Sequence, residues 1–286
     1  MFMFPQRLDR LLESYGLCSE RSSASFLRNN LIELNGQKLD FKDKLGSLAQ
    51  LRKIPVDVET DVLVINGKKM RFFPHQYILL NKPSGYVCSH VSDQSPTVYR
   101  LLEKFYESKA DKERIYIEEN LHSVGRLDKE TQGLLLFTTN QFFSHYFTAP
   151  QSNVPKTYLV ELFKPVDEQT QKLYAEKCAL GLFLPAEKKA GPCVTKPSKI
   201  VWLEERSCSI TVTEGRFHEV RRIFAALGNC VINLKRTAFA GLCLEESLME
   251  GSYRNLSLDE MKNLQSIYVE SAKKRGCPKS NECSAH

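Results

Sequence analysis

The sequence contains no long apolar run and no segment with the features of a secretory signal. Its apolar stretches fall well short of the roughly 20 residues needed to span a bilayer. The N-terminus, MFMFPQRLDRLLES, lacks a basic region followed by an apolar core and a small-residue cleavage site. These absences argue against a membrane protein or an exported protein, and we expect a cytoplasmic location.

Cysteine and histidine are present but never clustered. The nine cysteines are odd in number and scattered, and no two have the spacing of a zinc-ligand pair. The six histidines are equally dispersed, which predicts no metal site. Paired carboxylates and a nucleophile elbow are also missing, which disfavours a hydrolase. We therefore expect a reduced protein without disulfides or a bound metal.

The chain has the length of a two-domain protein and a mildly basic charge. Its 286 residues suggest two domains, at about 150 residues each. The formal net charge of +6 permits nucleic-acid binding without proving it, because many basic proteins bind none. The motifs along the chain have to decide this question.

The first segment, residues 6–70, has the pattern of two short helices and a hairpin. Leu8, Leu11 and Leu12 repeat at helical spacing before Gly16, and Asn35-Gly36 is a strong two-residue hairpin turn. The segment also carries basic residues that could hold phosphates, namely Arg7, Arg10, Arg21, Arg28 and Lys38. The alternative is a generic small α+β domain.

The order RLDRLL, a Ser-Glu-Arg helix and a strand entering Asn-Gly resembles the RNA-binding domain named after small-subunit ribosomal protein S-four. One departure is Asn29-Asn30, where that family usually has glycine, although asparagine also tolerates a left-handed backbone. We expect an S-four-like domain over residues 1–70 and a second domain over 75–260. The polar residues 261–286, which contain Gly276 and Pro278, are expected to form a flexible tail.

Two segments of the second domain combine a strand with a polar loop. Residues 77–89, YILLNKPSGYVCS, form an apolar strand that enters a Pro-Gly turn and presents Lys82. Residues 122–140 contain GLLLFTT, an apolar run typical of a buried strand, preceded by a loop with Arg126 and Asp128. A loop before a buried strand can hold a carboxylate rigidly in a cleft. The alternative is a structural Arg-Asp ion pair, since RLD also occurs at residues 7–9.

Two further segments supply aromatic and basic residues. KTYLVEL, residues 156–162, alternates as a strand does, so Lys156, Tyr158 and Val160 share one face. Tyr158 could stack on a base or fill the core. EGRFHEVRRIFAALGN, residues 214–229, predicts a helix that ends at Gly228, with a buried face of Phe217, Val220, Phe224 and Leu227.

The predicted helical phase separates two adjacent arginines. Arg221 should lie at the edge of the buried face and reach a cleft beside the core. Arg222 should point nearly opposite to that face and meet solvent or phosphate. A solvated helix charge is the alternative for both residues.

In their order and spacing, LNKPSGYVCS, GRLDKETQGLLLFT, KTYLV and GRFHEVRRIFAALG resemble the RsuA-type pseudouridine synthases of small-subunit ribosomal RNA. The resemblance implies an isomerase without cofactor or metal, whose catalytic domain has a mixed, largely antiparallel sheet flanked by helices. It places the catalytic aspartate at Asp128, the motif tyrosine at Tyr158 and the third, basic position at Arg221.

These residue types suit the isomerisation of uridine. A carboxylate at Asp128 can add to the uracil ring, attack the anomeric carbon or remove a sugar proton. Arg221 would keep it ionised, and Tyr158 would contact the base. The uridine must be flipped out, and Arg126 is placed to fill the space that it leaves. The other residues expected to contact RNA are Lys82, Lys156, Arg222, Arg7, Arg21 and Arg28.

The expected partner is 16S ribosomal RNA in a partly assembled small subunit, bound by a monomer of this chain. A large-subunit (23S) ribosomal RNA pseudouridine synthase stays open as an alternative. A non-catalytic RNA-binding assembly factor is the other alternative. The presence of Asp128, Tyr158 and Arg221 together counts against it, because loss of catalysis would permit drift at any of them.

Overall fold

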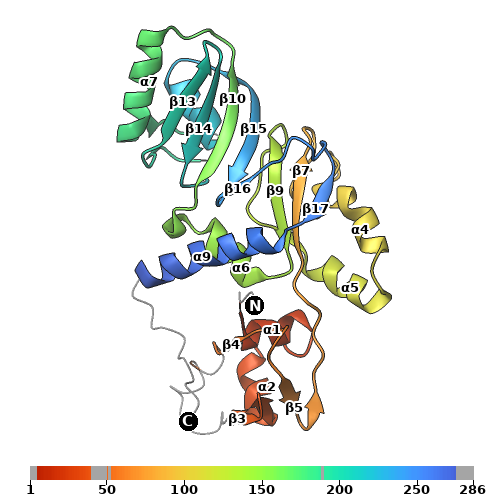
Figure 1. The fold of residues 1–286 in the computed structure, drawn as a ribbon. Helices are drawn as coiled ribbons and strands as arrows, with labels where there is room; N and C mark the ends of the chain where they lie inside the picture. Colours follow the sequence, from red (N-terminus) through yellow and green to blue (C-terminus); the bar gives the residue numbers. More distant parts are fainter. Residues whose placement is uncertain (1–4, 40–49, 51–52, 188–189, 275–286) are drawn as a thin grey trace. The chain divides into compact units, whose positions relative to one another are not determined.

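The computed structural model of the chain describes residues 5–39, 50, 53–187 and 190–274, and these form an α+β fold (Figure 1). Their contacts separate two compact units. The first contains residues up to 77 together with 103–123 and 137–145. The second contains residues 78–102, 124–136 and those from 146 onward. Among the described helices, none is long and apolar enough to cross a membrane.

The first unit begins with two helices and a small sheet. Helices α1 (Leu8–Ser14) and α2 (Ser23–Asn29) pack with a sheet of order β3-β2-β5-β6. Its strands are β2 (Ile32–Leu34), β3 (Gln37–Leu39), β5 (Leu63–Ile65) and β6 (Lys68–Lys69), while β1 (Gln6–Arg7) pairs with β4 (Pro55–Val56). The apolar side chains of α1 are fully buried in one core. The predicted helix and hairpin are therefore confirmed.

The first unit contains further segments. They are α4 (Glu103–Glu107), α5 (Asp111–Asn120), β8 (His122–Ser123) and the start of α6 (Gln141–Thr148). Tyr15 stacks on Tyr116 of α5 with ring centroids 4.6 Å apart, and its hydroxyl accepts a hydrogen bond from the Phe73 amide at 2.6 Å. The N-terminal helices thus share their packing with residues beyond position 100.

A long sheet forms the centre of the second unit. Its order is β13-β14-β10-β15-β9-β7-β17. The strands are β13 (Lys199–Glu204), β14 (Ser207–Val212), β10 (Lys156–Leu162), β15 (Val231–Phe239), β9 (Gln132–Thr138), β7 (Tyr77–Lys82) and β17 (Tyr253–Asn255). β10 is antiparallel to both β14 and β15, whereas β15 is parallel to β9. The predicted mixed, largely antiparallel sheet is confirmed.

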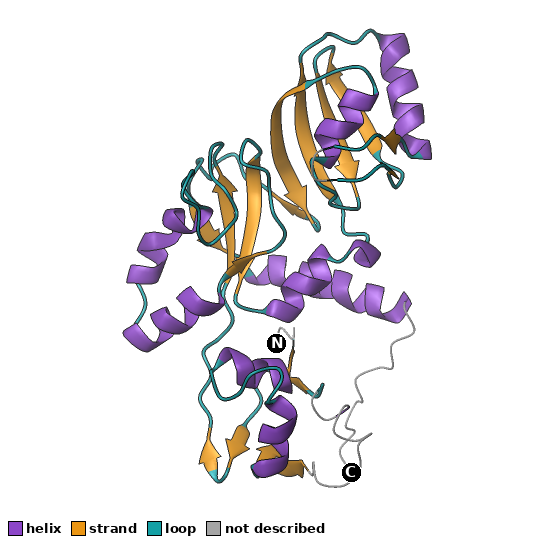
Figure 2. Ribbon diagram, turned by 180° about the vertical axis from the view of Figure 1, so that it is seen from behind, coloured by secondary structure: helices purple, strands orange, loops and turns teal. Residues whose placement is uncertain are grey.

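Shorter elements complete the second unit. They are the 3-10 helices η1 (Val98–Leu102) and η2 (Pro150–Ser152), helix α7 (Glu168–Leu180), the hairpin of β11 (Phe183–Leu184) and β12 (Cys193–Val194), and β16 (Leu242–Cys243). In Figure 2 the strands β13, β14, β10 and β15 form one layer with helices beside it. Trp202 of β13 donates its indole hydrogen to the Gln171 carbonyl of α7 at 3.2 Å, which holds α7 against the sheet.

The strand registers bring two side chains to the same place. Tyr158 of β10 lies opposite Arg236 of β15, and both side chains are buried while Leu159 is exposed. This confirms the face predicted for Tyr158. Gly133 of β9 has a φ of +99°, and a Cβ atom there would overlap the Arg236 carbonyl oxygen. Glycine at this position therefore permits the close approach of β9 to β15.

Two helices differ from the sequence-based prediction. α8 spans Glu219–Ala226, so it begins five residues later than predicted, although it ends before Gly228 as expected. His218, at its N-cap, has a left-handed backbone with a φ of +48°. The flexible tail expected from residue 261 is wrong as far as Lys274, because α9 spans Leu258–Lys274 and buries Met261 and Leu264. Residues 275–286 lie outside the described part of the chain.

Candidate active site

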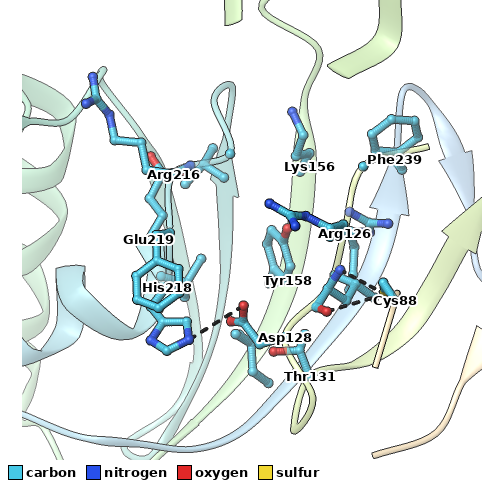
Figure 3. A pocket seen from close by; sticks show the side chains of 18 of the residues that line it. Cys88, Arg126, Asp128, Thr131, Lys156, Tyr158, Arg216, His218, Glu219 and Phe239 are labelled. Atoms are coloured by element: carbon cyan, nitrogen blue, oxygen red, sulfur yellow. Dashed lines mark hydrogen bonds and ion pairs between the residues drawn. The ribbon is translucent and has the colours of Figure 1, made fainter. Parts of the chain in front are cut away.

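A cavity of about 790 Å³ opens within the second unit, large enough for a nucleotide (Figure 3). Its walls come from β10, β15, the loop that carries Asp128 and the residues that enter α8. The predicted site residues that line it are Arg126, Asp128, Lys156 and Tyr158. Segments far apart in the sequence therefore place four of the expected side chains around one space.

The loop with Asp128 is held from several sides. Within the loop, the Thr131 amide donates to the Asp128 carbonyl at 3.0 Å. The Sγ atom of Cys88 lies 3.4 Å from both the amide and the carbonyl of Leu127. The Asp128 carboxylate itself is about one third exposed, at 35%. A carboxylate on a fixed backbone can thus still meet a ligand in the cavity.

Lys82 is one of the groups that hold this loop, and its expected contact with RNA is wrong. Its side chain is fully buried, and Nζ donates to the carbonyls of Pro83, Lys129 and Thr131 at 3.0, 3.0 and 2.8 Å. Burial lowers the pKa of this lysine to about 8. An ammonium with three buried acceptors is not available to a phosphate.

Tyr158 and Arg236 form the floor between the strands. Burial raises the pKa of the Tyr158 hydroxyl, although the charge of Arg236 and a hydrogen bond from it oppose the rise. The phenol therefore stays protonated and can donate. Nε of Arg236 donates to the Leu134 carbonyl at 2.7 Å, and its guanidinium lies over the Phe239 ring at 5.1 Å. Nη2 of Arg236 is buried with no hydrogen-bond partner among the described residues.

Lys156 and Arg126 add positive charge at the same cavity. Nζ of Lys156 donates to the Val154 carbonyl at 3.0 Å and lies 5.8 Å from the centre of the Phe239 ring. Burial lowers the pKa of Lys156 to about 8, and the charge of Arg236 lowers it further. Arg126 is exposed at the cavity wall, as its expected role requires.

The cavity also holds three residues that sequence reasoning missed. They are Arg236, His218 and Glu219. Nε2 of His218 lies 3.8 Å from Oδ1 of Asp128, and Glu219 of α8 is buried beside them (Figure 3). A sequence signal existed for Arg236, because it occupies an inward position of an alternating strand, two residues after Leu234. For His218 and Glu219 we find no such signal.

The two arginines of α8 do not occupy the predicted positions. Arg221 does not line the cavity, and its Nη1 donates to the Val231 carbonyl at 3.1 Å. Arg222, expected in solvent, is only 7% exposed and donates to the carbonyls of Pro185 and Gly191 at 2.8 and 3.2 Å. The burial of Arg222 does not come from an error in the predicted helical phase. Pro185 and Gly191 cover the side of α8 that the sequence left open.

The basic residues of the first unit differ in their availability. Arg7 forms a two-point contact with buried Asp9, at 2.7 and 3.1 Å, so its charge is already paired. Arg21, two residues before α2, and Arg28, in its last turn, are exposed. Among the described residues, no group of three or more His, Cys, Asp or Glu side chains could hold a metal ion.

Comparison with known proteins agrees with this geometry. The family model described as RNA pseudouridylate synthase matches residues 76–226, which contain Asp128, Tyr158 and most of the cavity. The chain belongs to this family. It is 36% identical to ribosomal small subunit pseudouridine synthase A of Haemophilus influenzae over 90% of this chain and 99% of that protein.

Two further proteins support the same family assignment. The protein of the same name from Escherichia coli (strain K12) is 34% identical over 80% of this chain and 90% of its own. A crystal structure of a pseudouridylate synthase, 34% identical in sequence, superposes with a TM-score of 0.57 and covers 91% of this chain and 99% of that one. The assignment of the chain to this family, and with it an isomerase activity on RNA, is therefore supported over nearly the whole chain.

Proposed function

We propose that this protein isomerises a uridine of small-subunit (16S) ribosomal RNA to pseudouridine, with Asp128 acting on the nucleotide. The observation that carries the proposal is a partly exposed carboxylate on a fixed loop, inside a nucleotide-sized cavity walled by Tyr158 and Arg236. The names of the relatives that match over most of the chain support the choice of small-subunit RNA.

The reaction exchanges one bond for another without net oxidation. The bond from the anomeric carbon to N1 of uracil breaks, and a bond from the same carbon to C5 forms. C5 loses its proton and N1 gains one. A carboxylate at Asp128 can add to the ring, attack the anomeric carbon or remove a sugar proton, and each route needs it ionised.

The other cavity residues suit the remaining tasks. Tyr158 offers a flat surface and a hydroxyl to the base. The buried Nη2 of Arg236 can donate to an oxygen of the flipped nucleotide, which would satisfy its missing hydrogen bond. Arg126, exposed at the wall, can enter the stack that the uridine leaves.

The finer parts of the proposal concern the substrate's state and the first unit. We propose that a monomer acts in the cytoplasm on partly assembled small-subunit RNA. Its S-four-like residues 1–70 would supply phosphate contacts through Arg21 and Arg28. The exposure of both arginines and the Asn-Gly hairpin of this segment support this assignment. Such contacts position an RNA without reading its sequence.

The target can be tested by mapping pseudouridine in both ribosomal RNAs from cells with and without this protein. We expect one site in the small-subunit RNA to depend on the protein. Loss of a site in the 23S RNA instead would support the large-subunit alternative. An unchanged map in both RNAs would support a non-catalytic assembly factor.

Asp128→Asn tests the mechanism. The amide has nearly the same size but neither the charge nor the nucleophilicity of the carboxylate, so turnover should fall by at least about 10⁴-fold. Thermal melting should stay unchanged, because the hydrogen bonds that hold the loop at Thr131 and Leu127 use backbone atoms and not the Asp128 carboxylate. Near-normal turnover in the folded variant would remove Asp128 from the mechanism.

A further inference from the structure

His218 is held on three sides at the edge of the cavity (Figure 3). The Phe217 ring stacks on the imidazole with centroids 3.8 Å apart and planes 20° from parallel. Nδ1 lies 3.2 Å from Oε1 of Glu187, and Nε2 lies 3.8 Å from Oδ1 of Asp128. In the described part of the chain, His218 is the only basic side chain within 4.0 Å of the Asp128 carboxylate.

Glu187 is in turn fixed to α8. The amides of Glu187 and Ala190 each donate to the other's carbonyl, at 2.8 and 2.9 Å, so the backbones of these two residues are paired. Arg222 donates to the carbonyls of Pro185 and Gly191, and its Nε lies 3.8 Å from Oε2 of Glu187. The buried arginine thus places Glu187 where it can orient the imidazole.

We propose that His218 is a positioning residue for Asp128, with Glu187 orienting its ring. One carboxylate oxygen of Asp128 then faces the imidazole, and the other is left for the nucleotide. The inference rests on the proposed role of Asp128.

The chemistry of the imidazole explains the arrangement. An imidazolium donates from both nitrogens and would bind both carboxylates. A neutral ring that donated to Glu187 would turn a lone pair toward Asp128. The separation of 3.8 Å is longer than a hydrogen bond, and such contacts often tighten only when substrate is bound.

The backbone of His218 makes two amide variants a matched pair. A left-handed φ of +48° is uncommon outside glycine, and asparagine tolerates it better than glutamine does. The amide of asparagine reaches the position of Nδ1, whereas that of glutamine reaches the position of Nε2. His218→Asn should therefore be the more stable variant, and His218→Gln should keep the contact with Asp128.

The test measures the single-turnover rate with saturating small-subunit RNA, assembled with its ribosomal proteins and taken from cells that lack this protein. His218→Asn should lower the rate by about 100-fold, since a misplaced reacting group costs about that much. His218→Gln should retain a rate at least about tenfold higher than that of His218→Asn, despite a lower melting temperature. The Kd for RNA should change little in either variant.

Glu187→Gln tests the orienting contact. Loss of the charge-assisted hydrogen bond should lower the rate by about tenfold. The same change should have no further effect in the His218→Asn background, because the two residues act on one carboxylate. Glu205→Gln, at an exposed position before β14, is the matched control and should leave the rate unchanged.

The outcomes separate this inference from the proposed function. Wild-type rates in both His218 variants would overturn the positioning role. A lower rate in the variant with the lower melting temperature would overturn it as well. If Asp128→Asn is inactive in that case, the proposed function still stands. Near-normal turnover in Asp128→Asn would overturn both.

Discussion

Lys82 shows how a single buried charge can serve a site that it does not enter. Its ammonium has three hydrogens, and three carbonyls around the Asp128 loop accept them. Burial lowers its pKa to about 8, with the charges of Cys88, Glu130 and Asp128 opposing the shift, so it remains mostly charged at neutral pH. Its contribution is to the shape of the loop.

Lys82→Met should therefore act on stability and turnover. The methionine fills a similar space but leaves three carbonyls without a donor, and we expect a loss of about 3 kcal/mol in the free energy of unfolding. Turnover should fall because the loop that carries Asp128 becomes less ordered, while the Kd for RNA should not change. Lys129→Met, at an exposed position of the same loop, is the control and should be near neutral. Weaker RNA binding with unchanged stability would restore Lys82 as an RNA contact.

The two candidate arginines can be separated by matched substitutions. Arg236→Lys removes the planar guanidinium beside Tyr158 and should lower the single-turnover rate by about 100-fold. Arg221→Lys keeps a donor near the Val231 carbonyl and should change the rate much less. Stability is compared by urea unfolding, because Arg236 is fully buried. The opposite order of effects at equal stability would return the third catalytic position to Arg221.

At the scale of elements, α8 is shorter than the periodicity of its sequence indicated, and its first turn carries a buried carboxyl group. Glu219 is 6% exposed, and its Oε2 accepts from the Arg216 amide at 3.1 Å. Burial raises the pKa of Glu219 to about 7, with the Arg216 hydrogen bond opposing and the charge of Glu214 adding to the rise.

This shift predicts a pH-dependent stability. The ordinary pKa of a glutamate is 4.5, so between pH 4.5 and about 7 the folded protein keeps a proton that the unfolded chain releases. Stability therefore falls as pH rises through this range. Glu219→Gln should remove the effect and be more stable than the wild type at pH 8, on the order of 2 kcal/mol. Urea unfolding at pH 4.5 and pH 8 measures the difference. An equal difference at both pH values would contradict the shift, and Glu205→Gln should show no pH-dependent gain.

At the scale of the whole molecule, the basic N-terminal segment is not separable from later residues. Tyr116, only 5% exposed, stacks on Tyr15 and would lose this cover if residues 1–70 were deleted. Substitution of surface residues is therefore a cleaner test of RNA binding than truncation.

Arg21→Ala with Arg28→Ala should weaken RNA binding without slowing the reaction. Removing two phosphate contacts should reduce the slope of log K against log salt by about 2 and lower affinity several-fold. The single-turnover rate at saturating RNA should stay unchanged. Arg10→Ala is the control, because that guanidinium is already paired with Glu13 and Glu20 at 2.7 and 2.6 Å. An equal loss from the control would show that total charge, not these two positions, matters.

Local patterns in the sequence were enough to determine several of the strands, the Asn35-Gly36 turn and two of the side chains that line the cavity. Alternation grouped Tyr158 with Val160 on one face, the Asn35-Gly36 pair formed the hairpin, and the apolar run after Asp128 formed a buried strand. These features depend on neighbours in the chain, so periodicity and turn chemistry reveal them. The resemblance of four ordered motifs indicated the chemistry.

Only the tertiary structure decided which charges face the cavity. Lys82 meets carbonyls 47 and 49 residues away, and Arg222 donates to the Gly191 carbonyl, which lies more than 30 residues before it in the chain. Arg236 enters the site because β15 lies between β10 and β9. Burial of a polar side chain depends on segments that are distant in sequence, and a helical or strand phase contains no information about what will cover it.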